Sequence, residues 1–164
     1  MTDLLTQAEY QAIAADIEFP RTAFIDGKFR AGTGAAFDTV NPATGKVLVE
    51  IAGCGAADVD FAVGKARAAF DQGHWSKMHP SARKDVLIRL CKLMTRHRRE
   101  LAVMESLESG KPILDCETID VPETIQCIKW HAEAVDKIYD QTSPAGDDAI
   151  AMIVRELRWR RGVA

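Results

Sequence analysis

The side chains best suited to nucleophilic attack or metal binding in this sequence are four cysteines and four histidines. A zinc site needs close ligand pairs, and a nucleophilic thiol needs a base held beside it. The cysteines are widely spaced with no C-x-x-C pair, and the histidines show no H-E-x-x-H spacing. We therefore expect reduced structural thiols and no metal centre built from these residues, which are Cys54, Cys91, Cys116, Cys127, His74, His79, His97 and His131.

A short glycine motif, Gly32-Thr33-Gly34, is similar to the start of a dinucleotide-binding loop. That loop follows a strand and opens a helix, so that the cofactor phosphates meet the helix N-terminus. Here the glycines precede a strand pattern, which begins at Phe37. We interpret the motif as a turn.

A group of acids, Asp115, Glu117 and Asp120, falls at an expected helix N-terminus, where the aligned backbone dipoles favour carboxylates. That structural role accounts for them. No Ser-His-Asp arrangement or G-x-S-x-G elbow is present. The residues alone therefore describe a scaffold without a reaction centre.

Length and composition indicate one globular domain or part of a larger one. The chain has 164 residues, 47% apolar and 27% charged, with a net charge of −3. A chain of this size can bury a sizeable core without disulfides. The acidic excess and the lack of a basic stripe argue against nucleic-acid or membrane partners. No apolar run could span a bilayer and the first residues do not resemble a signal peptide, so we expect a cytoplasmic protein.

Periodicity predicts a helix and two hairpins in the first third. The helix runs from Thr6 to Ile17 and stops before Pro20. Asp26-Gly27 supplies the positive φ angles of a tight turn within residues 24–30. A second hairpin joins strands at 37–40 and 47–51 through the Asn41-Pro42-Ala43-Thr44-Gly45 turn.

Three helices and a strand are predicted to follow. The first runs from Asp58 to Gly73, and the second is capped by Ser81 and continues to Gly110. The basic run 96–99 inside the second indicates a solvated face or a local break. The third spans 121–138, and residues 149–155 have a β-like pattern.

Several strings in this order resemble the N-terminal part of the NAD(P)-dependent aldehyde dehydrogenase superfamily. The similarity runs in register from about residue 22 to 156. The strings "DKIY" (136–139) and "AMIVRE" (151–156) look most like the γ-glutamyl-γ-aminobutyraldehyde dehydrogenase branch of putrescine breakdown. The other matching strings are "FIDGK" (24–28), "VNPATG" (40–45), "ARAAF" (66–70) with "HW" (74–75), "ESLESGKP" (105–112) and "WHAEAVDKI" (130–138).

The resemblance implies an α/β fold: the N-terminal part of an aldehyde dehydrogenase-like fold, incomplete, with β-hairpins, then helices, then one arm strand. It implies an N-terminal helix or arm at 1–20, the N-terminal part of the cofactor-binding domain at 21–142, the first strand of an oligomerisation arm at 143–156, and an aberrant tail at 157–164. Homo-oligomers are expected for the family.

In that family a cysteine thiolate attacks the aldehyde, hydride passes to NAD or NADP, and a glutamate activates the water that releases the acid. The segments that carry the cysteine, the glutamate and the cofactor loop lie beyond the matched region. None of the four cysteines here has the surroundings of the nucleophile. The resemblance therefore implies no catalytic or cofactor-binding residue in these 164 positions, and we expect no NAD or NADP binding by this chain alone.

The sequence departs from the family pattern after Glu156. Relatives continue with a string like P-V-G-V-V-G, whereas this chain has Leu157-Arg158-Trp159-Arg160-Arg161-Gly162. Those residues can be encoded CTC CGT TGG CGT CGT GGG, and removal of the T gives codons for Pro-Val-Gly-Val-Val-Gly. We therefore hypothesise a one-base frameshift or a gene-prediction error.

Some family members bind an alkali cation through backbone oxygens near the second hairpin and a carboxylate near the G-K-P turn. The matching positions are Thr39, Val40 and Glu108. Many relatives carry aspartate in place of Glu108, and part of the ligand set would come from residues beyond this chain.

Two hypotheses follow for the chain itself. The first is an inactive aldehyde dehydrogenase fragment of marginal stability, with exposed helix faces and an unpartnered edge strand at 150–154 that favours aggregation. The alternative is a non-catalytic interaction module that pairs with a full-length relative. A loose, dye-binding state indicates the fragment, and a soluble, cooperatively melting one indicates the module.

Overall fold

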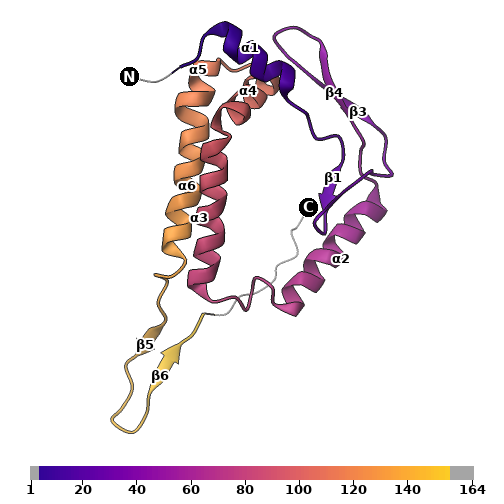
Figure 1. Cartoon of the computed structure of the whole chain (residues 1–164). Helices are drawn as coiled ribbons and strands as arrows, with labels where there is room; N and C mark the ends of the chain where they lie inside the picture. The colour runs from indigo at the N-terminus through magenta and orange to yellow at the C-terminus, as the bar shows by residue number, and fades with distance from the viewer. Residues whose placement is uncertain (1–3, 156–164) are drawn as a thin grey trace.

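The computed structural model describes residues 4–155 (Figure 1). The first helix, α1 (Gln7–Asp16), begins with the capping box that its sequence encodes. Thr6 Oγ1 accepts a hydrogen bond from the Glu9 N–H, and the Glu9 carboxylate accepts one of 2.8 Å from the Thr6 N–H. The predicted helix is thus confirmed.

Both predicted hairpins are present, each as its own two-stranded antiparallel sheet. Strands β1 (Ala23–Ile25) and β2 (Lys28–Arg30) join through Asp26 and Gly27, whose φ angles are 56° and 75°. Positive φ at both central positions is the geometry that matches the twist of a two-residue hairpin. Strands β3 (Phe37–Val40) and β4 (Val47–Ile51) pair with a register shift between Thr39 and Val40.

The glycine motif before β3 is a turn, as predicted, and α2 (Ala56–Gln72) fixes it. The Asp58 carboxylate accepts hydrogen bonds of 2.7 Å from the Thr33 N–H and Oγ1 and 2.8 Å from the Gly55 N–H. These bonds hold the pKa of Asp58 below its ordinary value. A Cβ on Gly32 would lie 2.0 Å from the Gly53 carbonyl oxygen, so the close approach of two backbones requires glycine there.

The segment predicted as one long second helix forms two helices. Helix α3 (Pro80–Arg96) and α4 (Arg98–Ser109) meet at His97, so the basic run holds a break. The predicted Ser81 cap is wrong, because Pro80 already occupies the first turn and His79 is the N-cap. Proline lacks an N–H and fits the first helical position, which places the start one residue earlier.

The third helix begins at Val121, as predicted, but ends earlier than predicted. It is preceded by α5 (Ile113–Asp115) and a π-helical turn, η1 (Cys116–Asp120), and α6 (Val121–Ala134) stops before Ile138. Helix α6 lies along α3 (Figure 1). The chain then forms a projecting hairpin of β5 (Gln141–Ser143) and β6 (Ala151–Ile153).

That hairpin corrects the prediction of an edge strand with no partner, because β6 pairs with β5 in antiparallel register. Its apolar side chains remain exposed, with Ile150 at 84% and Met152 at 68%. The aberrant tail predicted at 157–164 lies outside the described residues.

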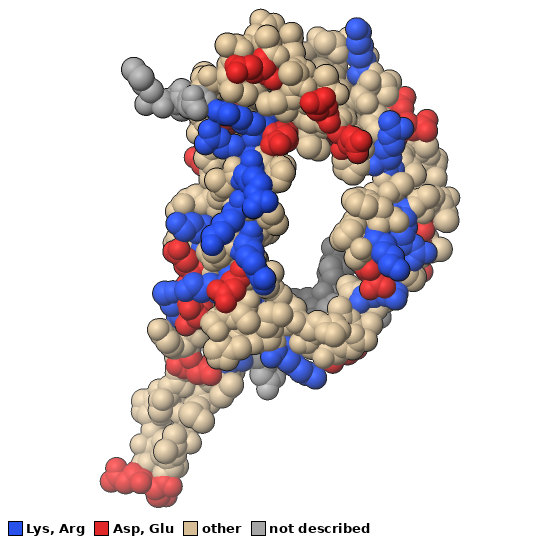
Figure 2. Space-filling model, in the orientation of Figure 1, with Lys and Arg blue, Asp and Glu red and all other residues tan. Residues whose placement is uncertain are grey.

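The buried core is small for the chain's size. The chain exposes 12373 Å², whereas a compact monomer of 18.0 kDa exposes about 8000 Å². Figure 2 shows an open space between the α3 side and the α2 side of the molecule. The buried apolar residues of the described chain are Val49, Cys91, Ala102, Val103, Cys116, Val121 and Ala132.

Candidate functional site

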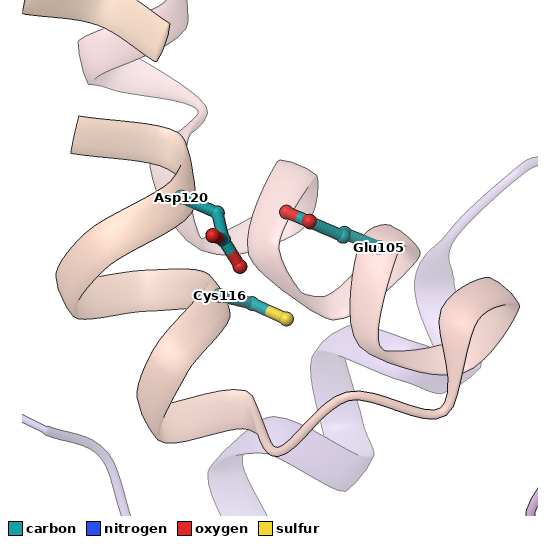
Figure 3. Close-up of side chains that lie close together, drawn as sticks. All are labelled: Glu105, Cys116 and Asp120. Atoms are coloured by element: carbon teal, nitrogen blue, oxygen red, sulfur yellow. The ribbon is translucent and has the colours of Figure 1, made fainter. Parts of the chain in front are cut away.

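The most concentrated group of chemically competent side chains lies where α4 meets η1. Glu105 from α4 and Cys116 and Asp120 from η1 each offer one ligand atom, and these atoms all lie within 4.8 Å of one another (Figure 3). Cys116 and Asp120 lie four residues apart in this helical turn, a spacing that places both side chains on one side. The sequence analysis explained Asp120 by the helix dipole and did not link it to Cys116 or Glu105.

The Cys116 side chain is fully buried, against Ala102 and Val121. Burial, and then the nearby charges of Glu105 and Asp120, raise the pKa of its thiol. A thiol with a raised pKa stays protonated at neutral pH and is a poor nucleophile. That Cys116 has no catalytic role stays a prediction from its sequence surroundings.

Lys111 lies beside the cluster and donates a hydrogen bond of 2.5 Å to Asp120 Oδ2. This bond raises the pKa of Lys111, which keeps its positive charge. The ion pair ties the turn after α4 to η1. Ser106 Oγ also donates to the Lys111 carbonyl at 2.7 Å, which holds the same turn from the α4 side.

A second polar cluster contains Glu117, whose side chain is 5% exposed. Its carboxylate accepts a hydrogen bond from the Tyr10 hydroxyl and one of 3.3 Å from Arg99 Nε, and Arg98 Nε lies 3.9 Å away. Glu117 does lie near a helix N-terminus, in η1 directly before α6, but its burial was not predicted. The carboxylate is buried because α1 and α4 close over it with a tyrosine and two arginines.

Beside Tyr10, an apolar groove of about 430 Å³ lies between α1 and the α4–α5 segment. Its walls are aliphatic apart from Tyr10, Gln7, Gln11 and Ser106. Such a groove can bind an apolar group but offers no acid, base or nucleophile of its own.

The three residues matched to an alkali-cation site lie in two elements. Thr39 and Val40 end β3, and Glu108 is exposed near the end of α4. The two elements approach each other closely, since a Cβ on Gly110 would lie 2.8 Å from Pro42 Cγ. The described contacts include no bond from the Glu108 carboxylate to the other two residues.

The remaining thiols and histidines lie apart from these clusters. Cys54 and Cys127 are exposed, Cys91 is buried, and all are free. Cys127 Sγ lies 3.7 Å from His131 Nδ1, one helical turn away on α6. His74 and His79 make local hydrogen bonds to Gln72 and Ser81. The absence of metal sites made from cysteine or histidine pairs stays a prediction, based on the spacing of these residues in the sequence.

Basic side chains line α3, which the sequence analysis did not recognise as a stripe. Arg89, Lys92 and Arg96 are exposed and lie at i, i+3 and i+7, so one helix face presents all three. Figure 2 shows Lys and Arg gathered on the α3 side of the open space. Arg89, Lys92 and Arg96 share a face only when this segment is helical. They are not adjacent in the sequence, unlike the basic residues of the run 96–99.

Apolar side chains of the helices are exposed beside this stripe. Leu90 and Leu93 on α3 are 42% and 49% exposed, and Val59 and Val63 on α2 are 54% and 45% exposed. No helix in residues 4–155 is long and apolar enough to cross a membrane. The helices therefore present faces of the kind that another protein layer covers.

A family model described as the aldehyde dehydrogenase family matches residues 29–157. The chain belongs to the aldehyde dehydrogenase family.

Individual relatives agree with that assignment. The chain is 54% identical over 157 residues to an aminoacetaldehyde dehydrogenase of Pseudomonas aeruginosa, covering 95% of this chain and 32% of the relative. It is 48% identical to the solved γ-glutamyl-γ-aminobutyraldehyde dehydrogenase of Burkholderia cenocepacia, with a TM-score of 0.83, covering 87% of this chain and 29% of that one.

A third relative is the solved indole-3-acetaldehyde dehydrogenase of Pseudomonas syringae in complex with NAD⁺. It is 38% identical, with a TM-score of 0.89, and the match covers 93% of this chain and 31% of that one. The chain spans about a third of the length of these relatives. The predicted fold class, the N-terminal part of an aldehyde dehydrogenase-like fold, is confirmed.

Proposed function

We propose that these residues are the N-terminal part of an enzyme that oxidises an aldehyde to a carboxylic acid with NAD⁺ or NADP⁺, and that the 164-residue chain alone is inactive. Two of the relatives are named for aldehydes that carry an aliphatic amino or amide nitrogen, aminoacetaldehyde and γ-glutamyl-γ-aminobutyraldehyde. We therefore infer an amino-aldehyde substrate for the longer enzyme, in agreement with a role in putrescine breakdown.

The surface area of the chain is the observation that carries this proposal. The 12373 Å² exposed exceeds the value for a compact monomer of this mass by roughly half. Part of the excess comes from the projecting hairpin, and part from the apolar faces of α2 and α3. Surfaces of this kind suit a scaffold that packs against further protein layers.

We propose that residues 1–20 form an N-terminal helix or arm, that residues 21–142 form the N-terminal part of the cofactor-binding domain, and that residues 143–156 hold the first strand of an oligomerisation arm. The exposed apolar residues Ile150 and Met152 and the free edges of the β5–β6 hairpin suit pairing with a second copy. The four free thiols suit a reducing compartment such as the cytoplasm.

An alkali cation held by the β3 end and Glu108 belongs to the same proposal. The close approach of Gly110 to Pro42 supports it, because it brings the end of α4 next to the turn that follows β3. Further ligands would come from outside residues 1–164.

We also propose that the tail from Leu157 is read in a shifted frame. The family model stops matching at residue 157, and removal of one base from one possible set of codons restores the family's string there. Sequencing the codons for residues 155–164 and several hundred bases beyond tests this. Unaltered codons with no family sequence in another frame contradict the frameshift but leave the family assignment intact.

The alternative function is an interaction module that pairs with a full-length relative. The exposed faces of α2 and α3 favour it as well, because a partner could cover them. Thermal unfolding separates the two: the module gives a cooperative transition without dye binding, and the fragment gives a broad transition with strong dye binding.

The activity test compares two proteins. The 164-residue chain is incubated with an amino aldehyde and NAD⁺ or NADP⁺, and reduced cofactor is followed by absorbance. A second protein, extended in the restored frame, serves as the comparison. We expect turnover only by the extended protein, and cofactor-dependent oxidation by the 164-residue chain would contradict the proposal.

A further inference from the structure

We propose that Glu105, Cys116 and Asp120 bind a thiophilic divalent cation, with Zn²⁺ as the ion that the donor set fits. The proposal is independent of the aldehyde-oxidising function. It concerns a buried corner between α4 and η1 that the chain builds from its own residues (Figure 3).

The donor chemistry selects the ion. A thiolate is a soft ligand and two carboxylates are hard ones, a combination that suits zinc or cobalt and not magnesium or calcium, which take oxygen ligands. Three protein ligands would leave the fourth tetrahedral position to water.

The bonding of these side chains also indicates a missing partner. Within residues 4–155 the Cys116 sulfur has no hydrogen-bond partner although it is 0% exposed, and the Glu105 carboxylate has neither a hydrogen bond nor an ion pair although it is half-buried. Figure 3 shows the Cys116 sulfur on the same side of the turn as the Asp120 and Glu105 carboxylates. A cation would give the buried Cys116 sulfur a partner and would add the half-buried Glu105 carboxylate as a second ligand.

Charge balance favours the same conclusion. With the thiol protonated, the two carboxylates and Lys111 leave one net negative charge at the cluster. Zn²⁺ with a thiolate makes the group of Glu105, Cys116, Asp120 and Lys111 neutral. The carboxylates are partly shielded from water, so a neutral group is favoured over one with a net charge.

The geometry is near that of a zinc site. Zinc bond lengths of about 2.3 Å to sulfur and about 2.1 Å to oxygen place tetrahedral ligand atoms about 3.6 Å apart. The three ligand atoms here lie within 4.8 Å of one another. Rotation of the long Glu105 side chain, which reaches the cluster from another helix, can close the difference.

Metal binding must displace the thiol proton, so it depends on pH. The groups around Cys116 are Glu105 from α4, Asp115 from α5, Asp120 from η1, and Lys111 from the preceding turn. Burial and the carboxylates favour the protonated thiol. Cation binding therefore releases the thiol proton of Cys116.

The test is a titration of the full 164-residue chain with Co²⁺, followed by the sulfur-to-cobalt charge-transfer absorption. We expect one Co²⁺ per chain, displaced by Zn²⁺. The change Cys116→Ser should abolish the band, whereas Cys91→Ser, at the other buried cysteine, should keep it. Because Cys116→Ser could disturb the core, Glu105→Gln provides a second variant, and it should weaken Co²⁺ binding roughly tenfold or more.

A competing thiol site exists at Cys127 and His131, so Cys127→Ser is measured alongside. A band that survives Cys127→Ser but not Cys116→Ser supports the proposal. A band lost only in Cys127→Ser overturns it, as does the absence of any band in the folded parent chain or unchanged affinity in Glu105→Gln.

Discussion

The Tyr10 hydroxyl donates a hydrogen bond of 2.5 Å to the buried carboxylate of Glu117, which lies 107 residues further along the chain. The bond joins α1 to the π-helical turn η1. Arg99 from α4 donates to the other carboxylate oxygen, so three segments meet at one buried anion. The N-terminal helix is thereby attached to the helical part of the fold.

Removal of that hydroxyl should weaken the attachment. We expect Tyr10→Phe to lower the free energy of unfolding by about 2 kcal/mol, because a hydrogen bond to a buried charge is lost. Urea denaturation followed by circular dichroism measures the change. Tyr139→Phe, at a residue 74% exposed, is the matched control and should have no effect. Equal losses in the two variants would mean that the Tyr10 bond contributes nothing.

The same pair predicts a loss of stability at high pH. Burial and the bond to Glu117 raise the pKa of Tyr10 above its ordinary value of 10.0. The stabilising contribution is therefore fully present below pH 10 and is lost as pH rises through the higher folded-state pKa. An ultraviolet phenolate titration measures this pKa, and Glu117→Gln should lower it. A titration that is unaffected by Glu117→Gln would contradict the assignment.

At the other end of the α3–α6 pair, Asp136 predicts a loss of stability in acid. Hydrogen bonds from Lys137 and Lys84 lower the pKa of Asp136 from 3.8 to about 2. The contribution is present above about pH 4 and is lost as pH falls toward 2. The urea midpoint measured from pH 6 to pH 2 should fall less in Asp136→Asn than in the parent. Asp60→Asn, at an exposed position on α2, should behave as the parent.

Two glycines should respond to alanine in opposite directions. A Cβ at Gly32 would lie 2.0 Å from the Gly53 carbonyl oxygen, so Gly32→Ala should destabilise the fold by separating two backbones. Gly64 lies inside α2 with nothing within 4 Å of an added Cβ, so Gly64→Ala should stabilise it by about 0.5–1 kcal/mol. Thermal unfolding of both variants checks this, and a stabilising Gly32→Ala would show that the two segments do not pack as described.

The exposed face of α3 should account for part of the chain's binding to hydrophobic dyes. We expect the double change Leu90→Gln and Leu93→Gln to reduce dye fluorescence and precipitation while the helical signal stays the same. Ile150→Gln measures the share that comes from the β5–β6 hairpin. Undiminished dye binding in the double variant would show that this face is covered in solution.

The local elements could be predicted from sequence because their signals are local. Asp26-Gly27 defines its hairpin, and Thr6 with Glu9 encodes the cap of α1. The partner strand β5 was missed because Gln141-Thr142-Ser143 has no apolar alternation. The basic run 96–99 predicted either a solvated face or a local break, and the structure has the break, at His97.

The clusters could not be predicted, because they depend on contacts between distant segments. From sequence, Glu117 is a carboxylate near a helix N-terminus. Its burial depends on Tyr10 and Arg99, which bind it from distant segments. Cys116 and Asp120 are four residues apart in sequence, but Glu105 reaches them only through the packing of α4 on η1. The family assignment, in contrast, depended on short strings in order and needed no tertiary contact.

The π-helical turn makes the length of this segment critical. Deletion of one residue between Cys116 and Asp120 would let residues 113–134 run as a single regular α-helix, which turns by about 100° per residue. Everything on the N-terminal side of the deletion would rotate by that angle relative to α6. The number of residues in this turn therefore determines which side chains of the segment before α6 face α4.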